Sequence, residues 1–297
     1  MVILNKALDW KSILFRRANL VLLFFTSLLC LFPIVHILSI SLSSSSAAAS
    51  GKVLLWPVQF TLASYEYVFT QKPFLTAFGI SFKRVLLGTA INFVLIVLTA
   101  YPLSKDNRVF VGRTLVAWYF VFVGFFGAGL IPFYMVVKST GLIDTIWALI
   151  LPGAVPVTSV ILVMHFFRGL PKEIEESATI DGAGQLKILW SLFLPLSLPV
   201  LVTVTLFTIV GHWNSWFDGL IFMNSTDKYP LQTFLQSLII KKDLRFSSVQ
   251  EAEAMLLVSD RTVHSAQIFV AAFPILIVYP FLQKYFLKGI IVGSVKG

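Results

Sequence analysis

The sequence predicts an all-α membrane protein with six transmembrane helices, and three observations support that fold class. Of its 297 residues, 57% are hydrophobic and 12% are charged, whereas a soluble domain is roughly 45–50% apolar and about 25% charged. The mean hydropathy is +0.87. Six apolar stretches are each near the ~20 residues that a helix needs to cross the hydrocarbon core. Most of the chain is therefore expected to lie in lipid.

The six spans are expected at residues 20–40, 85–103, 114–137, 146–167, 195–220 and 263–283. Asp218 is the only acidic or basic residue within them. The first stretch has a rival interpretation as a secretory signal, because a basic start and an apolar run precede the small residues 43–50. Its run of about 20 residues exceeds the 7–15 of a signal peptide. An uncleaved span is therefore favoured, with residues 43–50 as a flexible external turn.

The basic residues predict the orientation of these spans. The N-terminal tail, the loop after the second span, segment 168–195 and the C-terminal tail 284–297 together carry 13 basic and 6 acidic residues, against 10 and 8 elsewhere. Cytoplasmic loops are enriched in Lys and Arg, so both termini are predicted to be cytoplasmic in the cell membrane. Lys83 and Arg84, at the outer end of the second span, go against this rule. The net charge of +9 is dispersed over short loops, which favours membrane orientation over nucleic-acid binding.

The motifs of common catalytic sites are absent from the sequence. Cys30 is the only cysteine, so no intrachain disulfide or thiolate metal cluster is expected. The four histidines show no metal-ligand spacing, and the sequence has no G-x-x-x-x-G-K-[ST] phosphate loop. The chain is therefore predicted to be no enzyme by itself, with no catalytic residue, metal or cofactor of its own.

Segment 168–195 separates the fourth and fifth spans and is predicted to form two short helices around a glycine. Pro171 and the acidic residues after it suit a helix N-terminus, and Asp181-Gly182 suits its end. A second helix is indicated by apolar residues at i, i+3, i+4 and i+7, which are Leu186, Leu189, Trp190 and Phe193. On charge and periodicity alone, an amphipathic loop on the membrane surface is an equally good interpretation.

The spacing in this segment resembles the cytoplasmic EAA loop of binding-protein-dependent ABC importers. That loop has the form E-A-A, three residues, G, nine residues, I-x-L-P, and here Ser177 replaces one Ala and Leu192 replaces Ile. The resemblance implies a coupling helix that inserts into a groove of an ATP-binding subunit. The implied coupling residues are Glu176, Ser177, Ala178, Asp181, Gly182, Leu194 and Pro195.

Two further stretches resemble carbohydrate permeases. Near the outer end of the fifth span, an ionisable residue with amide and indole groups implies a substrate pathway, formed by Trp213, Asn214, Trp216 and Asp218. An interfacial aromatic belt is an equally good interpretation of this stretch. Residues 140–152 also resemble these permeases, and a structural role is expected, with Gly141 turning the chain and Asp144 or Thr145 capping the next helix.

The C-terminal stretch GIIVGSVKG resembles the tail of the maltose-type (MalG-like) inner permease. In that family the tail reaches the interface between two ATPase subunits, which implies contacts by Val295, Lys296 and Gly297. The chain is identified on these stretches as a member of the inner-membrane permeases of carbohydrate ABC importers, similar to those for oligosaccharides and polysaccharides.

This family implies a type I importer permease fold in a single domain, residues 1–297. It also implies a second, different permease as a heterodimer partner, two ATP-binding subunits that hold ATP and Mg, an external solute-binding protein, an oligosaccharide substrate and membrane lipid. An amino-acid or peptide importer is an alternative, because those importers share the EAA loop. A secondary transporter or a membrane enzyme would need carboxylates or histidines at mid-membrane.

Overall fold

The computed structural model describes residues 10–242 and 259–294, and all secondary structure in these ranges is helical. This confirms the predicted all-α class. Within these ranges the chain divides into two compact units, one with residues 10–71 and 259–272, the other with residues 72–242 and 273–294. Helix α15 (Asp260–Ser294) contributes its first part to one unit and the remainder to the other.

The first unit contains α1 (Trp10–Ser41), α2 (Ser45–Ala49) and α3 (Ala63–Thr70). Residues 43–50, predicted to be a flexible turn, instead contain the short helix α2. The Ser44 hydroxyl accepts the Ala47 N–H at 3.3 Å, which satisfies one of the free donors at the helix N-terminus. Ala48 is buried beside Ile40. The small residues here therefore allow close packing.

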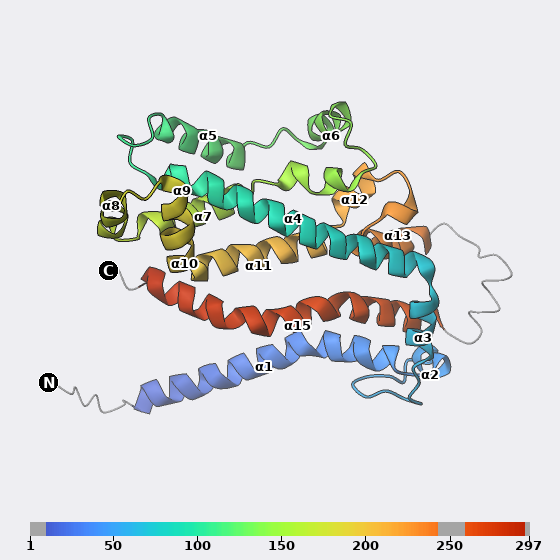
Figure 1. Ribbon diagram of the computed structural model, residues 1–297. Helices are drawn as coiled ribbons and strands as arrows, with labels where there is room; N and C mark the ends of the chain where they lie inside the picture. Colours follow the sequence, from blue (N-terminus) through green and yellow to red (C-terminus); the bar gives the residue numbers. More distant parts are fainter. Residues whose placement is uncertain (1–9, 243–258, 295–297) are drawn as a thin grey trace. The chain divides into compact units, whose positions relative to one another are not determined.

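The second unit is built around α4 (Lys72–Ser104), which packs against α7 (Val157–Arg168) and α11 (Leu198–Asn214) (Figure 1). These apolar helices share one core with the segment that precedes α11. Its buried residues include Ile96, Val97, Ala100, Val160, Val163, Leu189, Phe193, Val200, Leu201 and Val204. The shorter helices α5 (Arg113–Phe125), α6 (Leu130–Ser139) and α13 (Leu231–Lys242) belong to the same unit.

By length and apolar composition, three helices in the described part of the chain can each cross a membrane, namely Ser12–Ser41, Lys72–Ser104 and Asp260–Val278. Three pairs of helices qualify only if each bent pair is counted as one span. They are Arg113–Phe125 with Leu130–Ser139, bent by 116°, Ile146–Gly153 with Val157–Arg168, bent by 45°, and Gln185–Leu196 with Leu198–Asn214, bent by 84°.

The third and fourth expected spans, residues 114–137 and 146–167, are therefore not continuous helices. Gly129 has a φ of 84° where α5 gives way to α6, a conformation that glycine adopts without steric cost. Two 3₁₀ turns, η1 (Ile146–Leu149) and η2 (Leu151–Gly153), take the place of the first half of the fourth span. Pro156 separates these turns from α7. A proline has no N–H with which to continue the preceding helical hydrogen bonds.

The fifth expected span, residues 195–220, is interrupted at both ends. It is bent sharply before α11, and α11 ends at Asn214. A break at Ser215 separates it from α12 (Phe217–Phe222). Asp218 thus lies in the first turn of a separate short helix, where its carboxylate accepts the Gly219 N–H at 2.9 Å. The dipole of a helix favours an acid at this position.

The second expected span, residues 85–103, lies within the longer helix α4, which starts at Lys72 and also contains Lys83 and Arg84. The expected span starts after Arg84, because it is defined as an apolar stretch without acidic or basic residues. In the structure the Arg84 residue is 2% exposed, and it is paired with an acid distant in sequence. A charge that is paired inside the protein is a weak signal of membrane orientation.

Helices α4 and α11 pack so closely at Gly88 that adding one methyl group there, by substitution to alanine, should disturb the contact. A Cβ added at Gly88 would lie 2.4 Å from Nε2 of the buried His212. Overpacking of this kind costs about 1–3 kcal/mol. We therefore expect Gly88→Ala to lower the temperature at which the purified protein loses its monodisperse peak in size-exclusion chromatography. Gly79→Ala on the same helix is the control, since nothing lies within 4 Å of its added Cβ. Equal losses in both variants would contradict the tight contact.

A candidate coupling loop and a buried charged cluster

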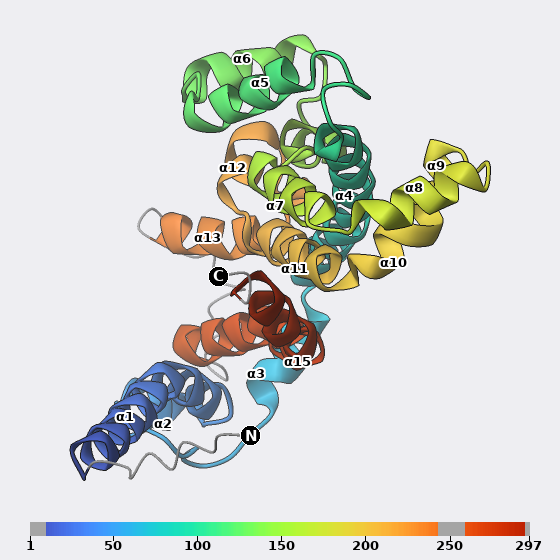
Figure 2. The same cartoon turned by 90° about the vertical axis from the view of Figure 1, so that its left-hand side faces the viewer.

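The predicted coupling loop, residues 168–195, contains α8 (Lys172–Ile180), which projects from its unit (Figure 2). The predicted end of this helix is confirmed in detail. The Gly182 N–H donates to the Thr179 carbonyl at 3.0 Å, and the Ala183 N–H donates to the Ala178 carbonyl at 3.0 Å. With Gly182 at a φ of 77°, these bonds form a Schellman motif, which satisfies the last carbonyls of a helix.

The second part of the loop does not form the predicted continuous apolar stripe. It consists of α9 (Gln185–Ile188), the π-helical turn η3 (Leu189–Phe193) and α10 (Leu194–Leu196). The π turn adds a residue to the turn, so side chains spaced for a regular α-helix separate onto different faces. Leu189 and Phe193 are buried as expected, whereas Leu186 is 67% exposed and Trp190 56% exposed.

The predicted coupling residues fall into two groups. Ala178 packs against the core of the unit and Leu194 is buried in it. The exposed members are Glu176, Ser177, Asp181, Gly182 and Pro195. Glu176 lies one turn before Ile180, which is 85% exposed. We call Glu176, Ser177, Ile180, Asp181 and Gly182 the exposed tip of the loop.

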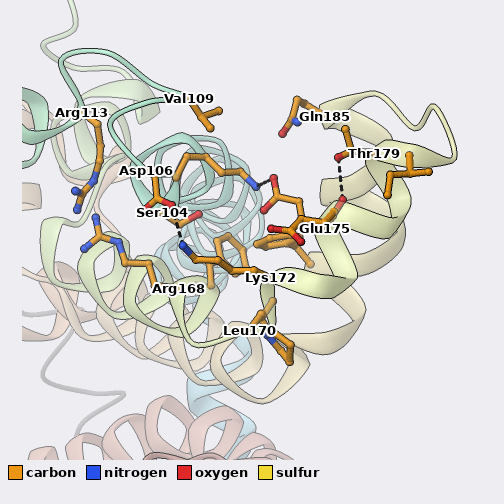
Figure 3. Close-up of a pocket in the computed structure, with 16 residues that line it drawn as sticks. Ser104, Asp106, Val109, Arg113, Arg168, Leu170, Lys172, Glu175, Thr179 and Gln185 are labelled. Carbon is orange, nitrogen blue, oxygen red and sulfur yellow. Dashed lines mark hydrogen bonds and ion pairs between the residues drawn. The ribbon is translucent and has the colours of Figure 1, made fainter.

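A cavity of about 740 Å³ lies between the exposed tip and the C-terminal end of α4 (Figure 3). Lys105, directly after α4, is 8% exposed and pairs with Glu175 of α8 at 2.5 Å. Its Nζ lies 4.0 Å from the centre of the Tyr101 ring and 4.3 Å from that of Phe193. Burial lowers the pKa of the Lys105 ammonium, and the hydrogen bond to Glu175 opposes that shift. In the sequence, Lys105 contributes only to the excess of basic residues that predicts topology.

Other charged groups of this cavity have separate partners. Arg113 and Arg168 both donate to the Leu103 carbonyl, at 3.0 and 2.8 Å, which satisfies an acceptor at the end of α4. Lys172 pairs with Asp106 at 2.9 Å, and Figure 3 shows these two side chains directed toward each other. This second ion pair is solvent-exposed, with side-chain exposures of 73% and 67%.

A second charged cluster is centred on Arg84. Its guanidinium pairs with the Asp218 carboxylate and also donates to the carbonyls of Leu149 and Ser215, at 3.2 and 3.3 Å. The Ser215 hydroxyl donates to Asp218 at 2.8 Å. One side chain of α4 therefore joins η1, the break after α11 and α12. Nothing near Arg84 in the sequence indicates this partner, 134 positions away.

Asn92 continues the polar contacts along α4. It donates to the Gly153 carbonyl at 3.1 Å, and its Oδ1 lies 3.3 Å from Nε2 of His212. Together with Arg84 and Asp218 these residues line a cavity of about 420 Å³.

The structure does not bring the four predicted pathway residues together on one surface. Trp213 is 4% exposed and packs edge-on against Phe78, with ring centres 5.7 Å apart. Asn214 and Trp216 are exposed, and Trp216 contacts the exposed ring of Phe217. Asp218 is the member that pairs with Arg84.

Residues 140–152 have a structural role, as predicted, but by a different contact. Gly141 has a φ of 72° and turns the chain. Thr145 occupies the N-cap position of η1, as expected, but its side chain makes no capping hydrogen bond. The Asp144 carboxylate instead accepts the Asn224 N–H at 3.0 Å and pairs with Lys228. It thereby fastens two loops of the same unit.

The predicted contacts of the C-terminal tail lie outside the described residues, since Val295, Lys296 and Gly297 follow the last described position. The preceding part of segment 284–297 is helical, because α15 continues to Ser294.

Comparison with known proteins gives relatives that cover nearly the whole chain. No family model matches it. It is 39% identical over 283 residues to Protein LplC of Bacillus subtilis (strain 168), with 95% of each chain covered. It is 37% identical over 271 residues to the polygalacturonan/rhamnogalacturonan transport system permease protein YtcP of the same strain, with 91% of this chain and 94% of the relative covered.

Similar solved structures also come from a bacterial ABC transporter for a polysaccharide. The chain is similar to one in the crystal structure of a bacterial ABC transporter involved in the import of the acidic polysaccharide alginate, with a TM-score of 0.87, 34% identity and 93% and 98% of the two chains covered. A chain from a bacterial alginate ABC transporter in complex with an alginate pentasaccharide-bound periplasmic protein shares the fold, at a TM-score of 0.55 and 14% identity.

Proposed function

The chain belongs to the permease subunits of ABC transporters that import sugars and polysaccharides, and from that premise we propose how this multi-pass membrane protein works. It forms half of a translocation pathway with a second permease, and two ATP-binding subunits that hold ATP and Mg drive the cycle. An external solute-binding protein delivers the substrate. The chain itself carries no ATPase chemistry and no cofactor.

The coupling loop is the observation that supports this proposal most strongly. Ala178 and Leu194 anchor it in the core, while the exposed tip leaves Glu176 and Ile180 available for a partner. An acidic residue beside an apolar one on a short helix suits docking in a groove. Contacts by the tail residues 295–297 with the ATPase pair stay part of the proposal.

A short fragment of an acidic polysaccharide is the substrate that we propose. One relative is named for polygalacturonan and rhamnogalacturonan transport, and a similar solved structure belongs to an alginate importer. The names of these relatives do not favour the amino-acid or peptide alternative.

The substrate pathway is proposed to use the exposed residues after α11. Asn214 and Trp216 supply an amide and an indole face, and such groups bind sugars by hydrogen bonds and stacking. Trp213 supports them from the core, and Asp218 positions α12 through its pair with Arg84.

Substitution of Trp216 tests this assignment. Stacking on one ring is worth about 0.5–1.5 kcal/mol, so Trp216→Ala is expected to slow uptake about 2- to 10-fold. The affinity of the isolated binding protein should not change, since that protein is separate. Uptake of a radiolabelled oligogalacturonide by cells is the measurement, and Trp56→Ala, at an 82% exposed position of the first unit, is the control. If Trp216→Ala takes up the substrate at the wild-type rate, the pathway assignment is wrong and these residues form only an interfacial aromatic belt.

The membrane topology is a second test. We propose six spans with both termini in the cytoplasm, in which α5 with α6 and the turns η1 and η2 with α7 each form one bent span, and the fifth span begins after the coupling loop. In a Cys30→Ser background, an impermeant thiol reagent applied to intact cells should label a cysteine at the exposed position 50. It should not label cysteines at positions 107 or 187 until the cells are permeabilised. Labelling of position 187 from outside would invert the topology and contradict ATPase docking.

A further inference from the structure

We propose that Lys105 and Glu175 are positioning residues that transmit movement of the coupling loop to the pore helix α4. This inference rests on the proposed docking of the exposed tip on an ATPase. It concerns a different step, because it assigns the connection behind the tip and not the contact with the partner.

Lys105 lies where four elements of one unit meet. Its ammonium contacts Glu175 of α8 and the rings of Tyr101 of α4 and Phe193 of η3. The Tyr101 and Phe193 ring centres are 5.1 Å apart, and that of Phe167 of α7 lies 6.3 Å from Tyr101 and 5.4 Å from Phe193. These three aromatic residues are buried. The lysine thus packs against a buried aromatic cluster to which α4, α7 and the loop each contribute one ring.

A second contact joins the other arm of the loop to the same helix end. The Tyr101 hydroxyl donates to Oε1 of Gln185 at 2.8 Å. Glu175 precedes the turn at Gly182, and Gln185 follows it. In Figure 3, Glu175 and Gln185 both lie on the side of the loop that faces the cavity. The segments before and after the turn are therefore both attached to the C-terminal end of α4. A displacement of the tip would exert force on that end of the helix.

Burial distinguishes this ion pair from its neighbour. The Lys105 and Glu175 side chains are 8% and 27% exposed, and a cation held over aromatic rings gains strength when water is excluded. Lys172 and Asp106 join the same two segments, but both side chains are largely in solvent. An exposed pair contributes little and breaks easily. The exposed pair is therefore a matched control for the buried one.

The experiment uses the complete transporter, reconstituted in lipid nanodiscs with its ATPase subunits, partner permease and ligand-loaded binding protein. Five variants are compared: Lys105→Met, Glu175→Gln, the double variant Lys105→Met/Glu175→Gln, Lys105→Arg and the control Asp106→Asn. Methionine keeps the length and apolar stem of lysine without its charge, which limits damage to packing. Two quantities are measured for each variant, the amount of ATPase subunit that co-purifies and the ATPase rate stimulated by the loaded binding protein.

We expect Lys105→Met and Glu175→Gln each to lose about tenfold of the stimulated rate, the equivalent of about 1.4 kcal/mol, while the ATPase subunits still co-purify. The double variant should be no worse than either single variant, because both remove one interaction. Lys105→Arg should restore most of the stimulation, and Asp106→Asn should stay near wild type. Normal stimulation in Lys105→Met would overturn the proposal. Loss of assembly in parallel with activity would also overturn it, since the pair would then serve only folding.

The alkaline limb of the pH profile gives a readout that a purely structural role would not move. Burial lowers the pKa of Lys105, so the ammonium loses its proton at lower pH than an ordinary lysine does. Arginine stays charged, so in Lys105→Arg the fall in stimulation should move to higher pH. The titratable and charged groups around this site, common to both forms, are Tyr101, Asp106, Arg113, Arg168, Lys172, Glu175 and Glu176. Identical alkaline limbs would count against the proposal.

Failure of this inference can be told apart from failure of the proposed function. Docking is reported by co-purification of the ATPase with variants of the exposed tip, such as Ile180→Asp. If Ile180→Asp abolishes co-purification while Lys105→Met keeps full stimulation, the docking holds and the transmission role fails. If Ile180→Asp leaves co-purification intact, the docking itself fails.

Discussion

Arg84→Met is expected to lower sharply the amount of correctly folded protein in the membrane. The substitution leaves Asp218 charged without its partner and frees the Leu149 and Ser215 carbonyls that Arg84 contacts. Breaking a buried ion pair from one side costs about 3–5 kcal/mol, which is a large share of the ~5–15 kcal/mol that stabilises a typical protein. The measurement is the monodisperse fraction of a fluorescent fusion after mild detergent extraction and heating.

Two further variants make this result specific. Lys83→Met removes the same kind of charge from the preceding, exposed position of α4, and we expect it to behave like wild type. The double variant Arg84→Met/Asp218→Asn should recover part of the lost protein, because no uncompensated charge remains. If Arg84→Met and Lys83→Met are equally stable, the cluster does not hold these elements together.

Changes in the exposed tip should uncouple the ATPase. Glu176→Lys reverses the charge at the proposed docking surface, and Gly182→Leu places a side chain where φ is 77°. Nothing lies within 4 Å of a Cβ added at Gly182, so the cost is backbone strain of about 1–2 kcal/mol and not a steric clash. Both variants are expected to lose at least about tenfold of ligand-stimulated ATPase activity, the equivalent of ~1.4 kcal/mol, in reconstituted transporters.

Gly184→Leu is the matched control for the turn. Gly184 has a φ of −70°, which leucine adopts readily, and it too has no atom within 4 Å of an added Cβ. It should retain normal stimulation. Equal losses in Gly182→Leu and Gly184→Leu would show that bulk, and not the left-handed turn, matters at this loop.

Local signals in the sequence predicted the parts of the structure that depend on neighbours in the chain. The Asp181-Gly182 pair marks a helix end because glycine tolerates a positive φ, and the structure places the Schellman motif there. Long apolar runs predicted where the helices lie, although three of the six runs are bent or interrupted. The EAA spacing favours a coupling loop over a general surface loop, and that role stays a prediction.

Features that depend on distant residues could not be predicted in this way. The sequence indicates only a charge outside a span at Arg84, because its partner Asp218 is 134 positions away. Lys105 was read as a loop charge, since its aromatic support comes from three separate helical segments. The π turn at Leu189–Phe193 changes the face of each side chain without a distinctive residue type. Trp213 resembled a pathway residue, but packing against Phe78 buries it.

The most direct test of the central claim is ATP-driven uptake by proteoliposomes. They would contain this chain, its partner permease and the ATP-binding subunits, with a labelled oligogalacturonide and its binding protein outside and ATP inside. We predict uptake that requires ATP and the loaded binding protein, and that is lost when Glu176→Lys replaces the wild-type chain. Uptake without ATP, or uptake unchanged by Glu176→Lys, would contradict a permease driven through the coupling loop.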